Sequence, residues 1–247
     1  MFWKLYSSDY NKLDRKFQEM NEVLKENNID LMGKVVLELG PGNSNINAYN
    51  FLLLGAKKVI LVDKFPRSLK TAKQKKYAED EIRFIREKNS GADFFFFEGF
   101  KLKPGYIEFI SQDLTEVKNL QVDFIYSISV LEHIKSIEEN IRKMSEILKE
   151  GGHMYHSIDM RDHFNFNNPF LFYKYSDSTW DKYLTKEGAS YTNRWRYDDF
   201  KEAFRNSGIK TSSEKTVKYS LKNIKLNEKY NNKKDIDIGE LKIILNK

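Results

Sequence analysis

The feature that most constrains the fold is a series of short apolar runs separated by segments of helical character. The runs cover residues 34–39, 58–63, 106–110, 122–129 and 153–158. Continuous apolar runs of this length are typical of strands buried on both faces of a parallel sheet. Because strands and helices alternate, we predict an α/β fold with helices on both faces of a mostly parallel sheet.

Helical patterns fill the gaps between these runs. Apolar residues recur at spacings of three and four from Tyr10 to Leu24, which predicts an amphipathic helix over residues 9–27. Further helices are predicted over 43–54, 66–88, 137–148 and 198–206, and Gly151-Gly152 are expected to end the third of these. Two late strands are predicted near 215–219 and 240–245. Residues 89–105 read as an irregular connection, in which Phe94–Phe97 are expected to be buried core.

Composition narrows the class of protein. The chain has 247 residues, of which 40% are hydrophobic, enough for one α/β domain over residues 1–247. It has no cysteine, which excludes disulfides, thiolate zinc sites and cysteine nucleophiles. No run approaches the ~18 apolar residues of a membrane span, and the first residues do not read as a secretory signal. We therefore expect a cytoplasmic protein.

The net charge is +6, with 42 basic and 36 acidic residues. A basic surface can attract nucleic acid, anionic lipid or phosphorylated small molecules. The charges are dispersed along the chain, however, and a lysine-rich composition explains them equally well. A small-molecule partner is expected and a nucleic-acid partner is not; the oligomeric state is left open.

The most specific local motif is Glu38-Leu39-Gly40-Pro41-Gly42, at the end of the first predicted strand. Glycine there permits positive φ and a close approach of the backbone to a ligand. A dinucleotide-binding turn would require a third glycine where this chain has Asn45. By itself the motif fits an ordinary tight turn between a strand and a helix equally well.

Carboxylates follow the next two strands. Asp63 ends the second strand, 21 residues after Gly42, where a carboxylate can accept both hydroxyls of a ribose. Asp113 follows the third strand and could accept a hydrogen bond from an adenine amino group. Each aspartate alone could be a helix N-cap, but their order at successive strand ends favours a nucleoside site.

The fourth strand leads into Ser127-Ile128-Ser129-Val130-Leu131-Glu132-His133-Ile134, and Leu148-Lys149-Glu150-Gly151-Gly152 precedes the fifth. Together with the glycine turn and the two aspartates, this order resembles class I S-adenosylmethionine (SAM)-dependent methyltransferases, closely over residues 31–158 and loosely elsewhere. The resemblance implies a doubly wound, Rossmann-like, seven-stranded sheet in the order 3-2-1-4-5-7-6 with the last strand antiparallel. It also implies SAM as cofactor and S-adenosyl-L-homocysteine (SAH) as product.

The same resemblance implies which residues bind the cofactor. Gly40 and Gly42 would admit its methionine part, while Glu38 would hold the turn or reach the amino group. Asp63, beside Lys64, would bind the ribose, and Asp113 with Leu114 the adenine. Ser127 would lie under the sulfonium, and residues 1–30 would form a helical lid. The predicted cofactor residues are therefore Glu38, Gly40, Gly42, Asp63, Lys64, Asp113, Leu114 and Ser127.

Candidate catalytic residues lie between His133 and His163, a stretch that holds all four histidines. Methyl transfer needs alignment of the acceptor and, for a hydroxyl, usually a base. His133 is the first candidate, although a packing or cofactor-contacting histidine fits its position equally well. Asp159 and His163 follow the fifth strand, where ligands collect, but a solvated loop is an equal alternative. A metal site from Asp159, Asp162 and His163 lacks diagnostic spacing, so no metal is predicted.

Residues 160–197 form an insertion in which aromatic side chains are interleaved with Asn and Arg. This suits a pocket that stacks a ring and pairs an anion, or a lid packed on the core. Its sequence resembles methyltransferases of bacterial surface-polysaccharide gene clusters, which implies a sugar, nucleotide-linked or phosphate-derived acceptor and O-methylation. The predicted acceptor-binding residues are Arg161, Tyr191, Asn193, Arg194 and Arg196.

Two alternatives stay open. An RNA or protein methyltransferase is suggested mainly by net charge, but residues 127–130 lack the Asn-Pro-Pro-Tyr pattern expected for a planar amine. A non-catalytic, SAM-binding partner of another protein is the second alternative, and the polar groups of the insertion speak weakly against it.

Overall fold

The computed structural model describes residues 9–65, 67–99, 101–165, 167–184, 191–221, 224–231 and 233–247. It divides into two compact units: unit 1 is Met1–Tyr126 with Ile147–His153, and unit 2 is Ser127–Glu146 with Met154–Lys247. The expectation of one domain over residues 1–247 stays a prediction. Residues 1–8 of the predicted lid, and residues 166 and 185–190 of the predicted insertion, lie outside the described residues.

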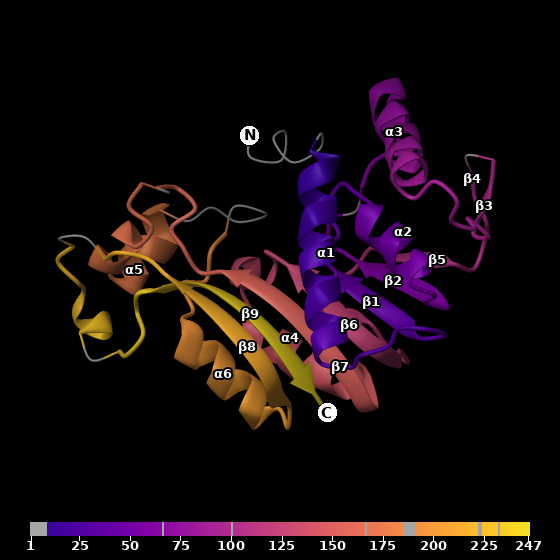
Figure 1. The fold of residues 1–247 in the computed structure, drawn as a ribbon. Helices are drawn as coiled ribbons and strands as arrows, with labels where there is room; N and C mark the ends of the chain where they lie inside the picture. Colours follow the sequence, from indigo (N-terminus) through magenta and orange to yellow (C-terminus); the bar gives the residue numbers. More distant parts are fainter. Residues whose placement is uncertain are drawn as a thin grey trace. The chain divides into compact units, whose positions relative to one another are not determined.

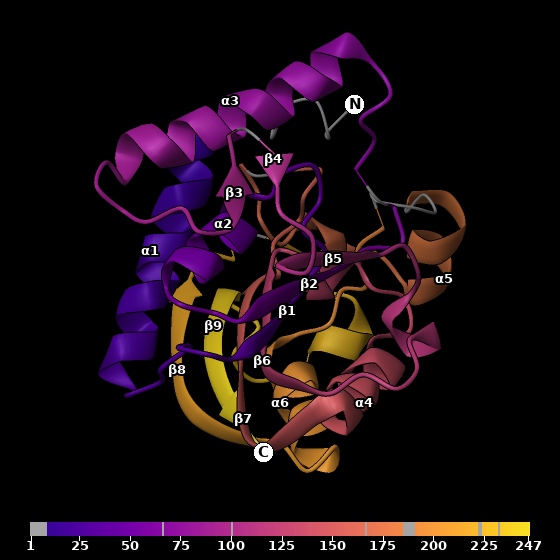
Figure 2. The same ribbon diagram turned by 90° about the vertical axis from the view of Figure 1, so that its right-hand side faces the viewer.

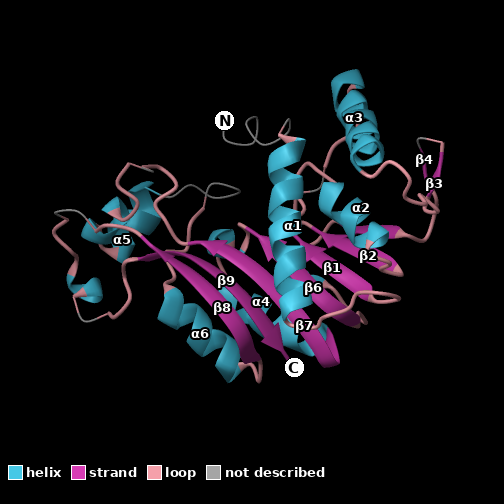
Figure 3. Cartoon of the chain, viewed as in Figure 1, coloured by secondary structure: helices cyan, strands magenta, loops and turns pink. Residues whose placement is uncertain are grey.

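The predicted α/β sheet is confirmed. Its strands are β1 (Val35–Leu39), β2 (Lys58–Val62), β5 (Ile107–Ile110), β6 (Val122–Ile128), β7 (Leu148–Asp159), β8 (Lys210–Lys218) and β9 (Ile238–Asn246), in the order β5-β2-β1-β6-β7-β9-β8 (Figure 3). β1 is parallel to β2 and β6, β2 is parallel to β5, and β8 is antiparallel to β9. Counted without the separate β3–β4 hairpin, this order is the predicted 3-2-1-4-5-7-6.

Unit 1 contains helices α1 (Tyr10–Glu26), α2 (Ile46–Leu53) and α3 (Ala72–Lys88). α1 and α2 lie side by side (Figure 1). The apolar stripe of α1 is buried, and Phe17 meets Phe51 of α2 with ring centroids 4.8 Å apart. The helix predicted over residues 9–27 is confirmed. Asp9 caps its first turn by accepting a hydrogen bond from the backbone N–H of Lys12.

Two details of unit 1 differ from the sequence prediction. α3 begins at Ala72 rather than near residue 66 because Thr71 and Gln74 form a reciprocal capping box. The connection predicted as irregular contains a small antiparallel hairpin, β3 (Phe97–Glu98) with β4 (Lys101–Leu102), next to α3 (Figure 2). Of the four phenylalanines, Phe96 and Phe97 are buried near Tyr49, whereas Phe95 is 37% exposed.

Unit 2 contains α4 (Ile137–Ile147, whose last residue belongs to unit 1), α5 (Asp177–Thr179) and α6 (Tyr197–Asn206). Its core is strongly aromatic and includes Phe170, Phe172, Tyr173, Trp180 and Tyr230. Short helical turns complete the described chain at Leu114–Glu116, Leu131–His133, Leu171–Lys174, Trp180–Leu184 and Glu228–Tyr230, the first of them in unit 1.

The expectation that Gly151-Gly152 ends a helix was wrong. α4 already ends at Ile147, and both glycines lie inside β7, which begins at Leu148. Gly151 has φ +72°, and a Cβ built on Gly152 would meet the Leu148 side chain at 2.7 Å, so the glycines permit a tight bend in the strand. No helix among the described residues is long and apolar enough to cross a bilayer.

Candidate functional site

The turn after β1 has the glycine geometry that the motif predicts. Gly40 and Gly42 have φ values of +68° and +64°, a region in which a side chain is strained. The N–H of Gly40 donates to the carbonyl oxygen of Val62 at 2.9 Å. This hydrogen bond fixes the turn against the end of β2.

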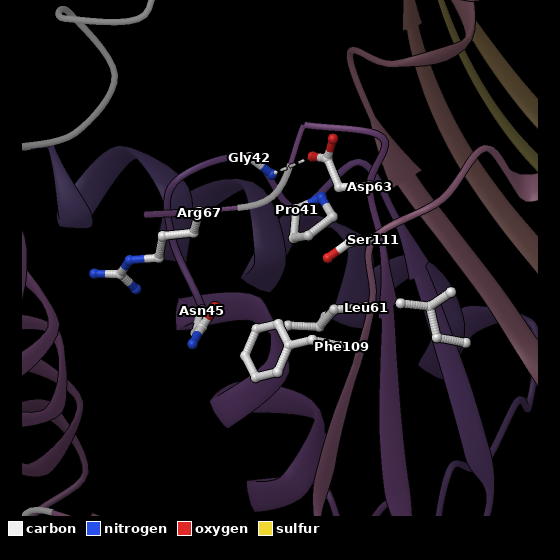
Figure 4. Close-up of a pocket in the computed structure, with 9 residues that line it drawn as sticks. Pro41, Gly42, Asn45, Leu61, Asp63, Arg67, Phe109 and Ser111 are labelled. Carbon is white, nitrogen blue, oxygen red and sulfur yellow. Dashed lines mark hydrogen bonds between the residues drawn. The ribbon is translucent and has the colours of Figure 1, made fainter. Parts of the chain in front are cut away.

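Asp63, at the end of β2, braces this turn. Its Oδ2 accepts the N–H of Gly42 at 3.3 Å, and its Oδ1 accepts the N–H of Phe65 at 2.7 Å. Burial raises the pKa of Asp63, and the two amide hydrogen bonds partly oppose that effect. Figure 4 shows the carboxylate beside Gly42 at a pocket lined by Pro41, Gly42, Asn45, Leu61, Asp63, Arg67, Phe109, Ile110 and Ser111. Lys64 is exposed.

Glu38 lies in β1, directly before the turn, and is buried. Its Oε1 accepts a hydrogen bond from Nδ2 of Asn47 at 2.8 Å, whereas its Oε2 has no hydrogen-bond partner among the described residues. Burial raises the pKa of Glu38 to about 7, although the Asn47 amide acts in the opposite direction. A buried carboxylate oxygen without a donor fits a ligand that brings one, such as the ammonium group of an amino acid.

Leu114 is buried, and the predicted cofactor residues Asp113 and Ser127 have partners within the protein. Asp113 caps the turn at Leu114–Glu116: its Oδ1 accepts from the backbone N–H and the hydroxyl of Thr115, at 3.2 and 2.9 Å. This is the N-cap role considered as its alternative. Ser127 is fully buried, and its hydroxyl lies 2.7 Å from Nδ1 of His156. A place under a sulfonium stays a prediction for Ser127.

His156 is a fully buried core residue, and it makes stability depend on pH. Burial lowers its pKa to about 3, against an ordinary value near 6.5. Because the unfolded chain binds this proton and the folded chain does not, stability is full above pH 6.5 and falls as the pH decreases toward 3. We expect His156→Asn to reduce the slope of unfolding free energy against pH, between pH 4 and 6, by about 1.4 kcal/mol per unit. Urea unfolding of both proteins between pH 4 and 6 measures these slopes. Equal slopes for wild type and His156→Asn would contradict the prediction.

A second polar cluster lies in unit 2, where β6 and β7 end. The rings of His133 and His163 are 4.9 Å apart, and Nε2 of His163 lies 3.2 Å from the carbonyl oxygen of Asp159. The carboxylate of Glu132 accepts the N–H of Asp159 at 3.2 Å. The three residues predicted as catalytic are thus brought together, with Glu132 as a fourth member.

The tautomer of His133 follows from its hydrogen bond. Its Nδ1 lies 2.6 Å from the carbonyl oxygen of Tyr191, which can only accept, so Nδ1 carries the hydrogen and Nε2 the lone pair. Burial lowers the pKa of His133, outweighing the opposing effect of that carbonyl. His133 is therefore neutral at pH 7 and can accept a proton at Nε2.

Asp159 is held as an anion. Burial alone would raise its pKa, but Arg161 donates two hydrogen bonds to its oxygens, at 2.8 and 2.7 Å, and with His163 holds the pKa well below the usual range. Burial likewise opposes protonation of His163, but Asp159 raises the pKa of that ring overall. Burial raises the pKa of Glu132 to about 8 despite the nearby His163.

Comparison with known proteins decides the family. The sequence profile described as a methyltransferase domain matches residues 10–218. The chain belongs to this methyltransferase family. No curated protein sequence matches it.

Solved structures share the fold at low identity. A SAM-dependent methyltransferase from Clostridium acetobutylicum is 15% identical, with a TM-score of 0.54 over 100% of this chain and 99% of that one. One from Mesorhizobium loti is 14% identical, with a TM-score of 0.52 over 92% and 96%. Magnesium protoporphyrin IX methyltransferase from Synechocystis, with bound SAH, is 11% identical, with a TM-score of 0.53 over 94% and 83%. The chain is a SAM-dependent methyltransferase, with SAM as its cofactor.

The arginines predicted to bind the acceptor of this methyltransferase are engaged by the protein. Arg194 is buried and donates to the carbonyl oxygens of Phe172 and Tyr175 and to the carboxylate of Asp177. Arg196 is buried and donates to the carbonyl oxygens of Met160 and Ile238, at 2.5 and 2.7 Å. These contacts argue for structural roles, and acceptor binding by both stays a prediction.

Asn193 and Tyr191 support the turn that carries His133. The Nδ2 of Asn193 donates to the carbonyl oxygens of Leu131 and Ile134, at 2.8 and 3.0 Å. Tyr191 uses its backbone carbonyl to orient His133, while its side chain is half-buried. Both residues therefore support the methyltransferase's histidine cluster, a role that residue type alone did not indicate.

Two residues of the site were missed from sequence. Glu132 was noted only as part of the family motif, and Asn47 only as part of a helix. The spacing of Asn47, nine residues after Glu38, corresponds to no recognised pattern. The sequence does contain a signal for Glu132: it lies between the apolar Leu131 and the candidate base His133, where a buried carboxylate beside the histidine could have been expected.

Proposed function

We propose that this methyltransferase O-methylates a small sugar, nucleotide-linked or phosphate-derived acceptor in surface-glycan biosynthesis in the cytoplasm. The observation that carries the proposal is the geometry of His133. Its Nδ1–H is held by the carbonyl of Tyr191, so a neutral Nε2 is kept ready to accept the proton of a hydroxyl.

One group of residues would bind the cofactor, and another would act on the acceptor. SAM supplies a methyl group already activated on a sulfonium. Glu38 would accept the ammonium of the cofactor at its unpartnered Oε2, and Asp63 would accept the ribose hydroxyls beside the glycine turn. His133 would take the proton of the acceptor hydroxyl at Nε2 as the oxygen bonds to the methyl carbon and the carbon–sulfur bond breaks, leaving SAH.

The neighbouring polar groups favour a hydroxylated acceptor. Asp159 offers carboxylate oxygens that accept hydrogen bonds, and Arg161, which pairs with it, adds positive charge close to His163. Such a mixture suits a sugar hydroxyl next to an anionic group. The likeness of the insertion to methyltransferases of surface-polysaccharide clusters supports the same class of acceptor.

The test is transfer of tritium from methyl-labelled SAM to extracted glycan precursors, total RNA and a protein extract. We expect label in the glycan-precursor fraction, and none with the Asp63→Asn variant. Label confined to RNA or protein would support the alternative methyltransferase classes instead. Tight SAM binding without label in any fraction would favour a non-catalytic partner and overturn the proposal.

A further inference from the structure

The histidine cluster of unit 2 has the composition of a metal site. Glu132, His133 and His163 each offer one ligand atom, and the three atoms lie within 4.8 Å of one another. Two imidazole nitrogens and one carboxylate oxygen form a donor set that suits first-row divalent transition metals. The set differs from the aspartate-rich one considered from sequence, because the short turn at Leu131–His133 places Glu132 beside both rings.

A second observation points to a ligand at the same place. Glu132 is 1% exposed, and its Oε2 has no hydrogen-bond partner among the described residues, although its Oε1 is held by the N–H of Asp159. Leaving a buried carboxylate oxygen unpaired costs free energy that a protein normally avoids. A cation bound at Oε2 would remove that cost.

The groups around the cluster match the usual surroundings of metal-bound histidines. Such histidines donate their other ring N–H to a carbonyl or a carboxylate, which fixes the ring. His133 does so through Nδ1 to the carbonyl of Tyr191. His163 directs Nε2 to Asp159, 3.2 Å from the carbonyl oxygen and 3.7 Å from Oδ2. Arg161 in turn holds the Asp159 carboxylate with two hydrogen bonds.

We propose that Glu132, His133 and His163 bind a divalent transition-metal ion such as Zn²⁺, Mn²⁺ or Fe²⁺. Atoms bound at ~2.1 Å to one ion lie at most ~4.2 Å apart, so small side-chain rotations draw the three groups together on binding. Three protein ligands leave coordination positions open for an acceptor oxygen. This last role rests on the proposed function, whereas metal binding itself does not.

The bound ion changes the chemistry available to the acceptor. A hydroxyl coordinated to a divalent ion loses its proton more readily, so the ion activates the nucleophile while His133 acts as a ligand instead of a base. The charge of the ion also exceeds that of the single carboxylate that binds it. The site therefore attracts an anionic acceptor oxygen, in agreement with a phosphate-derived or acidic sugar.

The experiment is calorimetric titration of tag-free, chelator-treated protein with Co²⁺, Zn²⁺ and Mg²⁺, without SAM or acceptor. We expect one Co²⁺ or Zn²⁺ per chain, visible absorption bands for bound Co²⁺, and no comparable binding of Mg²⁺. Glu132→Gln and His163→Ala should weaken binding by at least ~100-fold, and Asp159→Asn by about 10- to 100-fold. His153→Gln removes a histidine outside the cluster and should leave binding unchanged.

Glu132→Gln is the sharpest variant, because glutamine keeps an acceptor for the N–H of Asp159 and preserves the shape of the side chain. Circular dichroism checks that each variant folds. The proposal is overturned if folded wild type binds no ion stoichiometrically, or if Glu132→Gln and His163→Ala bind as wild type does. Because the metal titration contains neither SAM nor acceptor, its outcome is separate from that of the proposed function, which the labelling experiment tests.

Discussion

Asp63→Asn is expected to weaken SAM binding by at least about 100-fold. The substitution removes the negative charge that would accept two ribose hydroxyls, and hydrogen bonds to a charged group contribute about 1.5–3 kcal/mol each. It also weakens the acceptor that holds the N–H of Gly42 and thereby shapes the glycine turn. Isothermal calorimetry with SAM measures the loss, and thermal unfolding shows whether the variant keeps its fold.

Asp93→Asn is the matched control. It makes the same chemical change at an exposed position of unit 1, in the loop after α3, and Asp93 does not line the pocket beside Asp63. It should bind SAM like wild type. If Asp63→Asn also binds SAM with unchanged affinity, the nucleoside site is not at the end of β2, and the assignment of Glu38 and the glycine turn fails with it.

His133→Asn is expected to reduce kcat by about 10²- to 10⁴-fold while the Kd for SAM changes less than about twofold. That range is the usual contribution of a positioned general base. Asparagine can still donate to the carbonyl of Tyr191, so the turn that carries it should persist. Initial rates at saturating SAM, with the acceptor found in the labelling experiment, measure the effect.

His153→Gln provides the control for this second variant. His153 lies in β7 and belongs to unit 1, outside the cluster, so its loss should leave kcat within about twofold of wild type. A His133→Asn enzyme with normal kcat would rule out a role in catalysis for this residue, as the base or as a ligand of a catalytic metal ion. If kcat falls, the metal titration of wild type separates those two roles: a protein that binds no ion would need His133 as the base.

The sheet could be predicted because its strands carry a strong local pattern. Val36, Leu37, Val59 and Leu61 are all buried, so the apolar runs of β1 and β2 mark central strands directly. The residues at which helices begin and end were less predictable. The start of α3 depends on one reciprocal hydrogen-bond pair at Thr71 and Gln74, and composition marks this only weakly. The β3–β4 hairpin could not be predicted, because each of its strands has only two residues and no residue type in them is specific to a hairpin.

The two halves of the candidate site were predictable to different degrees. The glycine turn and Asp63 follow consecutive strands, so parallel topology alone brings them to one sheet edge. Glu132 gains its importance from burial, which arises only when the chain after β6 is folded. Binding of an anionic acceptor by Arg194 stays a prediction, and the contacts of its guanidinium with the carbonyl oxygens of Phe172 and Tyr175 and with the Asp177 carboxylate could not be read from the sequence, because they arise only in the folded chain.

Arg196 has a consequence for how the enzyme responds to acid. It connects the chain after β7, at Met160, with the start of β9, at Ile238. A guanidinium keeps its proton throughout the range in which enzymes are assayed. The two hydrogen bonds that Arg196 donates therefore persist when histidines take up protons. The acid-dependent loss of stability expected from His156 therefore does not arise at this contact, and turnover that falls between pH 7 and 5 while the protein stays folded reports the reacting groups.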